Sequence, residues 1–191
     1  MRRLYEKVMA LAASPRAEWW LFAIAFSEAS FFPIPPDAML IPMAMAAPKR
    51  AWRYALIALS GTLIGGTFGY ILGHWLFAVA AQPILRAYHY EAAFHVFQRT
   101  FQRWGVWIIL VKGLTPIPYK IVTIAAGAAS FNYPLFIAAS AVTRGGRFFL
   151  VCGLLRRWGE PIRGFIERHL ALVIIVLVLS IIGGFLLLRY V

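Results

Sequence analysis

The longest uncharged stretch of the chain limits its fold more than any other feature. Residues 54–85 contain no Asp, Glu, Lys or Arg, and a helix needs only ~20 apolar residues to cross the hydrocarbon core of a bilayer. Hydrophobic residues make up 62% of the 191 residues and charged residues only 14%, which are too few to cover a soluble domain of this size. We therefore expect residues 1–191 to form one all-α integral membrane domain with a spanning helix at 54–81.

Further segments have the composition of spanning or interfacial helices. Residues 170–188 are also uncharged, which predicts a C-terminal transmembrane helix. Residues 134–155 are hydrophobic but contain two arginines, so they predict a spanning helix with a charged interior. The connectors 83–104 and 156–169 mix basic and apolar residues, which is typical of amphipathic helices at the membrane interface. The N-terminal residues predict a short cytoplasmic or interfacial helix.

Two other hydrophobic segments, about 19–47 and 106–129, contain prolines that interrupt a helix. Proline removes an amide donor and clashes with the preceding turn, at about 3 kcal/mol in a helix interior. Each segment is expected to form a helix, a break and a second helix. In lipid, broken backbone is tolerated only where protein buries it or where it lines a wet cavity, and a re-entrant hairpin meets that requirement. The interrupting residues are Pro33, Pro35 and Pro36 in the first segment and Pro116 and Pro118 in the second.

The two halves of the chain repeat one pattern. A shift of 83 residues, from Pro33 to Pro116, brings one Pro-Ile-Pro onto another and Asp37 onto Lys120. Residues 19–81 and residues 105–155 are each expected to form a re-entrant hairpin followed by a spanning helix. The excess of basic residues beside the first hairpin places the N-terminus in the cytoplasm and the two hairpins in opposite orientations. Such an inverted repeat is found in many transporters.

Glycines recur at every fourth position of the first expected span. This spacing allows another helix to approach closely. The predicted packing residues are Gly61, Gly65, Gly69 and Gly73.

Six charged side chains lie within the apolar segments. An ionisable group at membrane depth costs several kcal/mol unless it is paired or hydrated, and such groups usually have a function. Two acids and four bases leave a positive field that suits an anionic, phosphate-bearing headgroup, and the carboxylates could also exchange protons. The alternative is that these charges only fix the helix register. The predicted substrate- or proton-binding residues are Glu28, Asp37, Lys112, Lys120, Arg144 and Arg147.

Several function classes find no support in the sequence. It contains no HExxH, GxSxG or P-loop motif, so we expect no enzyme. Cys152 is the only cysteine and His89 and His95 have no matching ligand set, so neither a metal nor a cofactor is expected.

The net charge of +12 fits the excess of Lys and Arg on the cytoplasmic side of membrane proteins. The aromatic residues lie within apolar runs, which argues against nucleic acid as a partner. Homo-oligomerisation stays open.

Three stretches, SEASFFPIPPDAMLIPMA, GTLIGGTFGYILG and KGLTPIPYKIVTIAAGAASF, resemble the DedA family, also called the SNARE-associated or VTT-domain family, and within it the YqaA-like branch. The resemblance covers about 26–159. It implies two re-entrant hairpins that face each other, and lipid transport or scrambling such as the recycling of undecaprenyl phosphate. It places the family acids at Glu28 and Asp37 and the family's basic residues at Lys112 and Lys120. Much of the family has Arg there, and Lys lacks the planar fork that Arg offers to phosphate.

The leading hypothesis is a lipid flippase or scramblase in the bacterial inner (cytoplasmic) membrane. It would move an anionic lipid, such as a polyprenyl phosphate or a phospholipid, with or without coupling to protons. Two alternatives stay open: a proton-coupled transporter of a small solute or cation, and a membrane-homeostasis protein that transports nothing.

Overall fold

The computed structural model describes residues 14, 16–31, 35–88, 90–114 and 119–168. These residues form helices and turns without any strand. The expected N-terminal helix, the expected span 170–188 and the residues Pro33, Pro116 and Pro118 lie outside this part of the chain. The helices are α2 (Ala17–Ser30), α3 (Asp37–Ala46), the 3₁₀ turn η1 (Pro48–Arg50), α4 (Ala51–Leu76), the π-helical turn η2 (Phe77–Ala81), α5 (Gln82–Ala87), α6 (Glu91–Leu114), α7 (Tyr119–Ala128) and α8 (Tyr133–Arg168).

Two long apolar helical segments form the centre of the molecule. Residues Pro48–Ala81 and Tyr133–Gly159 are each long and apolar enough to cross a membrane. They cover the expected spans 54–81 and 134–155. The backbone of α8 departs from helical angles at Trp158, close to the point where the apolar stretch ends.

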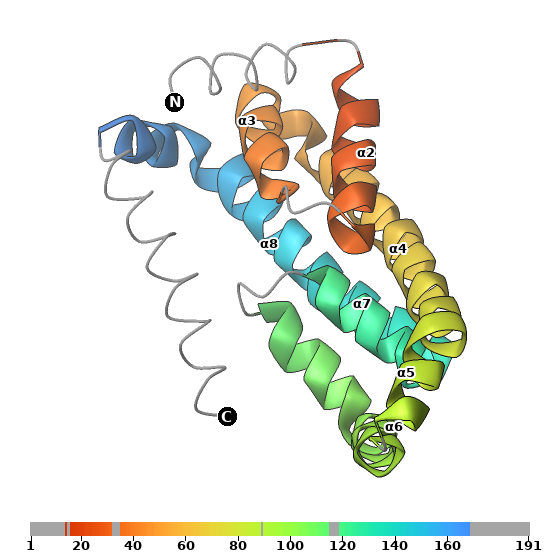
Figure 1. Ribbon diagram of the computed structural model, residues 1–191. Coiled ribbons are helices and arrows are strands. Elements are labelled where there is room, and N and C mark those ends of the chain that lie inside the picture. The colour runs from red at the N-terminus through yellow and green to blue at the C-terminus, as the bar shows by residue number, and fades with distance from the viewer. Residues whose placement is uncertain (1–13, 15, 32–34, 89, 115–118, 169–191) are drawn as a thin grey trace.

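Two shorter helix pairs pack against these long helices from opposite ends. The first pair, α2 and α3, lies beside the start of α4, and the second pair, α6 and α7, lies near its other end (Figure 1). Each pair divides its contacts in the same way: α2 and α7 pack mainly on α4, whereas α3 and α6 pack mainly on α8. The order of one helix pair followed by one long helix therefore occurs twice in the chain.

Local sequence explains where α3 and α8 begin. Pro36 precedes α3 with φ of −63°, and proline suits a helix start because its missing N–H would have no partner there. Asp37 is the first residue of α3, where a negative charge interacts favourably with the helix dipole. Asn132 caps α8, since its Oδ1 accepts a hydrogen bond of 3.0 Å from the Leu135 N–H.

The glycine face of α4 receives two different helices. A Cβ added at Gly61 or Gly65 would collide with a carbonyl oxygen of α2, and one added at Gly69 or Gly73 would collide with α7. Because side chains are missing along this face, both helices approach the backbone of α4 closely. The helix α4 thereby positions one helix from each half of the chain, α2 and α7.

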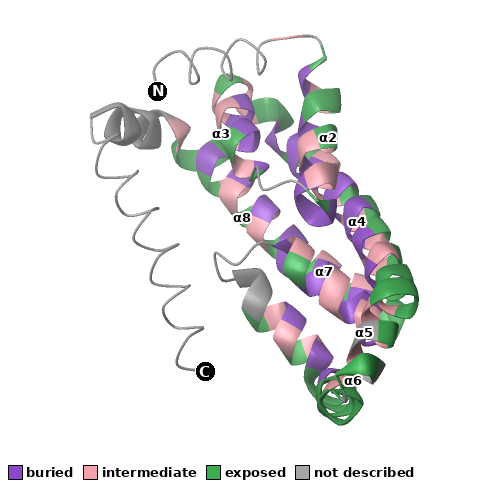
Figure 2. Cartoon of the chain, viewed as in Figure 1, coloured by how far each residue is buried: buried purple, intermediate pink, exposed green. Residues whose placement is uncertain are grey.

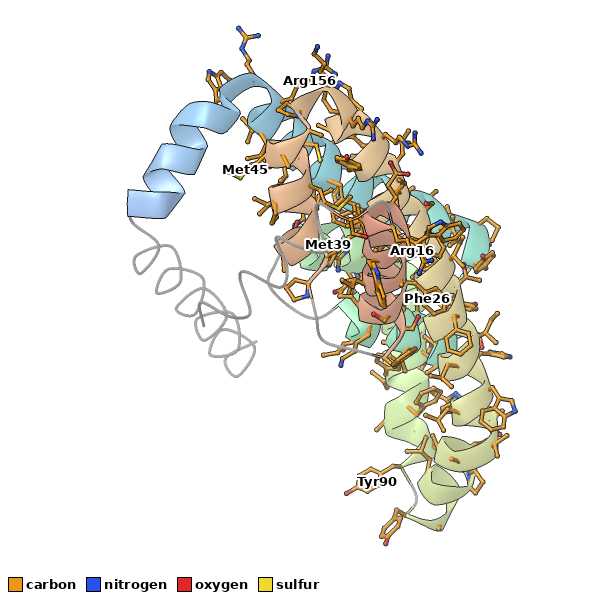
Figure 3. All side chains as sticks on the ribbon, turned by 90° about the horizontal axis from the view of Figure 1, so that it is seen from above. Arg16, Phe26, Met39, Met45, Tyr90 and Arg156 are labelled. Carbon is orange, nitrogen blue, oxygen red and sulfur yellow. The ribbon has the colours of Figure 1, made fainter. Side chains whose placement is uncertain are left out.

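The buried and exposed residues follow from this arrangement. One buried cluster joins α2, α3 and the start of α4 to the later part of α8, and the other joins α6 and α7 to the start of α8 (Figure 2). Large apolar side chains such as Ile71, Trp75 and Val142 point outward, as they do in helices that face lipid. Arg156 and Tyr90 lie at opposite ends of the molecule (Figure 3).

One expected boundary is wrong. The sequence suggests an interfacial helix at 83–104 and a separate hairpin arm from 105, but residues 91–114 form the single helix α6. The composition changes from mixed to apolar near Gly105, but the helix continues through this residue. Gly105 fits within the helix because the ring of Phe131 occupies the space where a side chain at this position would lie.

Candidate ion-pair site

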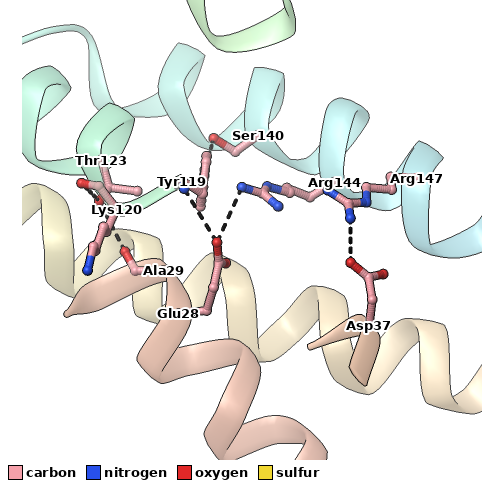
Figure 4. Close-up of polar contacts among 9 residues, drawn as sticks. All are labelled: Glu28, Ala29, Asp37, Tyr119, Lys120, Thr123, Ser140, Arg144 and Arg147. Carbon is pink, nitrogen blue, oxygen red and sulfur yellow. Dashed lines mark hydrogen bonds and ion pairs between the residues drawn. The ribbon is translucent and has the colours of Figure 1, made fainter. Parts of the chain in front are cut away.

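The last turn of α2 meets the first turn of α7 at the centre of the structure. The Thr123 hydroxyl donates to the Ala29 carbonyl at 3.1 Å, and the Tyr119 N–H donates to Glu28 Oε1 at 3.4 Å (Figure 4). Ser30 ties the same turn to α4 through a hydrogen bond of 3.0 Å to the Gly65 carbonyl. The residues just before the first expected break and those just after the second are thus brought together.

A buried ion pair lies at this meeting point. Arg144 Nη2 of α8 is 3.7 Å from Glu28 Oε1, and the two side chains are only 5% and 11% exposed. The guanidinium carbon of Arg144 is 4.2 Å from the centre of the Tyr119 ring. The Tyr119 hydroxyl is in turn hydrogen-bonded to Ser140 Oγ. Two charges at this depth are therefore held by groups from three helices.

A second ion pair lies one turn further along α8. Arg147 Nη2 contacts Asp37 Oδ2, and the side chains are 36% and 17% exposed. Arg144 and Arg147 are three residues apart, so they share one face of α8. One face of α8 thus pairs with Glu28 and Asp37 of the first helix pair.

Not every polar atom of these residues is paired. Among the described residues, buried atoms without a hydrogen-bond partner include Glu28 Oε2, Asp37 Oδ1 and Arg144 Nε. An unpaired polar atom in a low-dielectric surrounding is costly. Both acids therefore keep one oxygen, and Arg144 one donor, that another polar group could bind.

Lys120 is placed differently from the two arginines. If the two hairpins face each other, the repeat predicts that the two acids lie against Lys112 and Lys120. The structure instead pairs the acids with arginines of α8, and Lys120 Nζ donates to the Phe31 carbonyl at 3.3 Å. Phe31 follows the last residue of α2, where a cation interacts favourably with the carbonyl end of the helix. The side chain of Lys112 lies outside the described part of the structure.

The sequence alone does not single out Tyr119 and Ser140. An aromatic residue after a break is usually a packing residue, and a serine in a hydrophobic helix is common. One signal was present: Ser140, Arg144 and Arg147 follow a spacing of four and three residues, which places them on one helix face. Of the prolines predicted to interrupt the first segment, Pro35 is exposed in the turn and Pro36 is buried before α3.

A polar cluster at the far end fixes the turn between α7 and α8. Gln102 of α6 donates to the carbonyls of Ala129 and Ser130 at 3.0 and 2.8 Å. The Tyr70 hydroxyl of α4 donates to the Phe131 carbonyl at 2.6 Å. Ser130 has a φ of 51°, a strained value for a residue other than glycine, so these bonds hold an unfavourable turn. No group of three His, Cys, Asp or Glu side chains in the described residues could hold a metal ion.

Comparison with known proteins now assigns the family. The sequence model of the VTT domain matches residues 34–157, a range that includes Asp37 and both arginines. The chain belongs to the VTT-domain (DedA) family. An uncharacterized protein of Haemophilus influenzae is 35% identical over 185 residues, which cover 96% of each chain. An uncharacterized protein of Histophilus somni is 36% identical over 151 residues, or 79% of this chain and 78% of the relative. No solved structure matches.

The VTT-domain match and the helical structure indicate the same class of protein, a helical membrane protein. Its described residues are helical, and two of its helical segments are long and apolar enough to span a bilayer. It is therefore a helical membrane protein of this family.

Proposed function

We propose that this protein moves an anionic, phosphate-bearing lipid across the bacterial cytoplasmic membrane, and that the two ion pairs bind the headgroup on its way. The observation that carries the proposal is the buried pair of Glu28 and Arg144, which lies where the two helix pairs meet. A charged pair at the centre of a bilayer is expensive. Well-packed apolar residues would stabilise the fold as well or better, so binding explains the charges better than packing does.

The lengths of the short helices support a re-entrant arrangement. The helices α3 and α7 have ten residues each, and ten residues extend about 15 Å, half of a hydrocarbon core of ~30 Å. Each would begin in the middle of the membrane and return to the face from which its helix pair entered. In the proposed topology the two helix pairs enter from opposite faces, the long helices and residues 170–188 span, and the N-terminus is cytoplasmic. Exposed basic residues near the start of α4 and near the end of the apolar stretch of α8 would then face the cytoplasm: Lys49, Arg50, Arg53, Arg156 and Arg157.

The charges of the site suit a phosphate group. Glu28 and Asp37 are balanced by Arg144 and Arg147. Lys120 contacts neither acid but adds one positive charge near them, so the five charges sum to one net positive charge. Arginine binds phosphate with two parallel hydrogen bonds. In the proposed cycle a headgroup displaces a carboxylate from its arginine, first at the more exposed Arg147 and then at Arg144. The released carboxylate is free to take up a proton, which would couple lipid movement to the proton gradient.

The test is a lipid-transfer assay in proteoliposomes. A fluorescently labelled anionic phospholipid is incorporated in both leaflets, and a membrane-impermeant reductant destroys the label on the outside. Wild-type protein should expose the inner label rapidly, whereas Glu28→Gln and Asp37→Asn should slow the transfer about tenfold or more, because each leaves an arginine without its exchange partner. Normal transfer in both variants would remove the ion pairs from the mechanism.

A matched control is available in the same helices. Glu18 of α2 pairs with Arg53 of α4 at 2.6 Å, with side chains 27% and 65% exposed. This pair lies outside the proposed site and an exposed pair contributes little to stability. The Glu18→Gln variant should therefore transfer lipid at the wild-type rate.

A further inference from the structure

Tyr119 touches both members of the buried ion pair through different atoms. Its N–H donates to Glu28 Oε1, and its ring lies against the Arg144 guanidinium. Its hydroxyl is bonded to Ser140. The residue is 1% exposed and Ser140 is fully buried. Tyr119 therefore joins α2, α7 and α8 at the pair itself.

The contacts of Arg144 explain why an aromatic ring matters there. The distance of 3.7 Å from its Nη2 to Glu28 Oε1 is too long for a hydrogen bond, and its buried Nε has no hydrogen-bond partner among the described residues. The guanidinium carbon of Arg144 lies over the Tyr119 ring, 4.2 Å from its centre, which is a favourable arrangement for a desolvated guanidinium. The ring stabilises the charge without a carboxylate oxygen, so it does not take the place of an oxyanion acceptor at the N–H donors.

The Ser140 contact holds the hydroxyl end of that ring. Ser140 lies four residues before Arg144 on the same face of α8. One helix thus positions both the cation and the ring that supports it. A second carboxylate would also stabilise Arg144, but it would occupy the donors and neutralise the charge.

We propose that Tyr119 is a positioning residue, which holds Arg144 buried and oriented while leaving the edge of its guanidinium free for an oxyanion. This inference rests on the proposed function, because it assigns Tyr119 a role in headgroup binding. The Tyr119 N–H is a further donor beside the same position, since it faces the carboxylate that the headgroup would replace. The ligand class that fits is a phosphate or another oxyanion that accepts two parallel hydrogen bonds from a guanidinium.

The first experiment varies the ring and measures transfer against the mole fraction of anionic phospholipid. Tyr119→Phe and Tyr119→Trp keep a ring, and they should keep the half-saturating fraction within about threefold of wild type. Tyr119→Leu should raise it about tenfold or more, because the cation loses its support. Tyr70→Leu is the control: it removes a tyrosine hydrogen bond and ring contacts in the second buried cluster, and should leave half-saturation unchanged. Equal values for Tyr119→Leu and Tyr119→Phe would overturn the proposal.

The second experiment needs no transport. The energetic coupling between Glu28 and Arg144 is measured from the unfolding of Glu28→Gln, Arg144→Gln and the double variant, with Tyr119 and in the Tyr119→Leu background. The coupling, expressed as a ratio of unfolding equilibrium constants, should fall about fivefold or more without the ring. An unchanged coupling would contradict the positioning role. If wild-type protein moves no lipid but the coupling falls, the proposed function fails and the positioning of Arg144 stands.

Discussion

The two ion pairs of α8 use the same chemistry in different surroundings. Glu28 and Arg144 have side chains 11% and 5% exposed, whereas Asp37 and Arg147 are 17% and 36% exposed. Removing one member of a buried ion pair strongly destabilises the fold, because the remaining buried charge has no partner. A partly exposed pair is screened by solvent and can exchange partners at little cost. We infer that the inner pair holds the structure in register and that the outer pair makes the first exchange with a headgroup.

The inner pair gives the largest expected effect. Glu28→Gln leaves Arg144 buried without a counter-charge, and should lower the free energy of unfolding by about 3–5 kcal/mol. Reversible unfolding in mixed detergent micelles would measure it. The double variant Glu28→Gln with Arg144→Gln should lose less than the sum of the two single losses. A loss below about 1 kcal/mol for Glu28→Gln would mean that the inner pair behaves like an exposed one.

The packing that places Glu28 gives the next largest effect. Gly65 lies under the backbone of α2, where an added Cβ would collide with the Phe26 carbonyl. Gly65→Ala should lower the free energy of unfolding by about 1–3 kcal/mol, because α2 must move away from α4. The control is Gly146→Ala in α8, where a Cβ meets nothing within 4 Å, and it should be neutral or stabilise by up to about 1 kcal/mol. Equal effects at the two positions would argue against close packing of α2 on α4.

The outer pair should separate stability from transport. Asp37→Asn removes a partly exposed pair, so the free energy of unfolding should fall by about 1 kcal/mol or less. Lipid transfer should nevertheless decrease about tenfold or more, because the exchange partner of Arg147 is lost. The two quantities are measured on one preparation. Full transfer activity in this variant would restrict the site to the inner pair.

Lys120 gives the smallest expected effect. Its Nζ contacts the Phe31 carbonyl rather than an acid, so Lys120→Gln should cost about 0.3–1 kcal/mol, the range for a cation at a helix C-terminus. Transfer should stay within about threefold of wild type. A loss of transfer as large as that of Asp37→Asn would place the lysine among the headgroup ligands.

The sequence identifies charged residues within the apolar segments but not how they are paired. Glu28, Asp37, Arg144 and Arg147 could be found because each is an expensive residue in an apolar segment. Their partners depend on which helices lie side by side, and that is decided by packing between distant segments. Lys120 showed this limit, since its place in the repeat suggested a role in the ion pairs and it reaches a backbone carbonyl instead.

Helix boundaries and supporting residues were less predictable for a related reason. A change of composition near Gly105 does not interrupt α6, because no proline removes an amide there and Phe131 fills the space beside the glycine. Tyr119 is chemically ordinary until Arg144 is known to lie against its ring. The order of helix pair and long helix, by contrast, followed from the prolines and the apolar runs.

Binding of a phosphate headgroup by the paired charges can be measured by comparing, in proteoliposomes, the initial transfer rates of a labelled polyprenyl phosphate and of the corresponding neutral polyprenol. We predict that the protein accelerates the phosphate about tenfold or more over the alcohol, and that Arg147→Gln abolishes this preference. Equal acceleration of both lipids, or a preference that survives Arg147→Gln, would contradict the account.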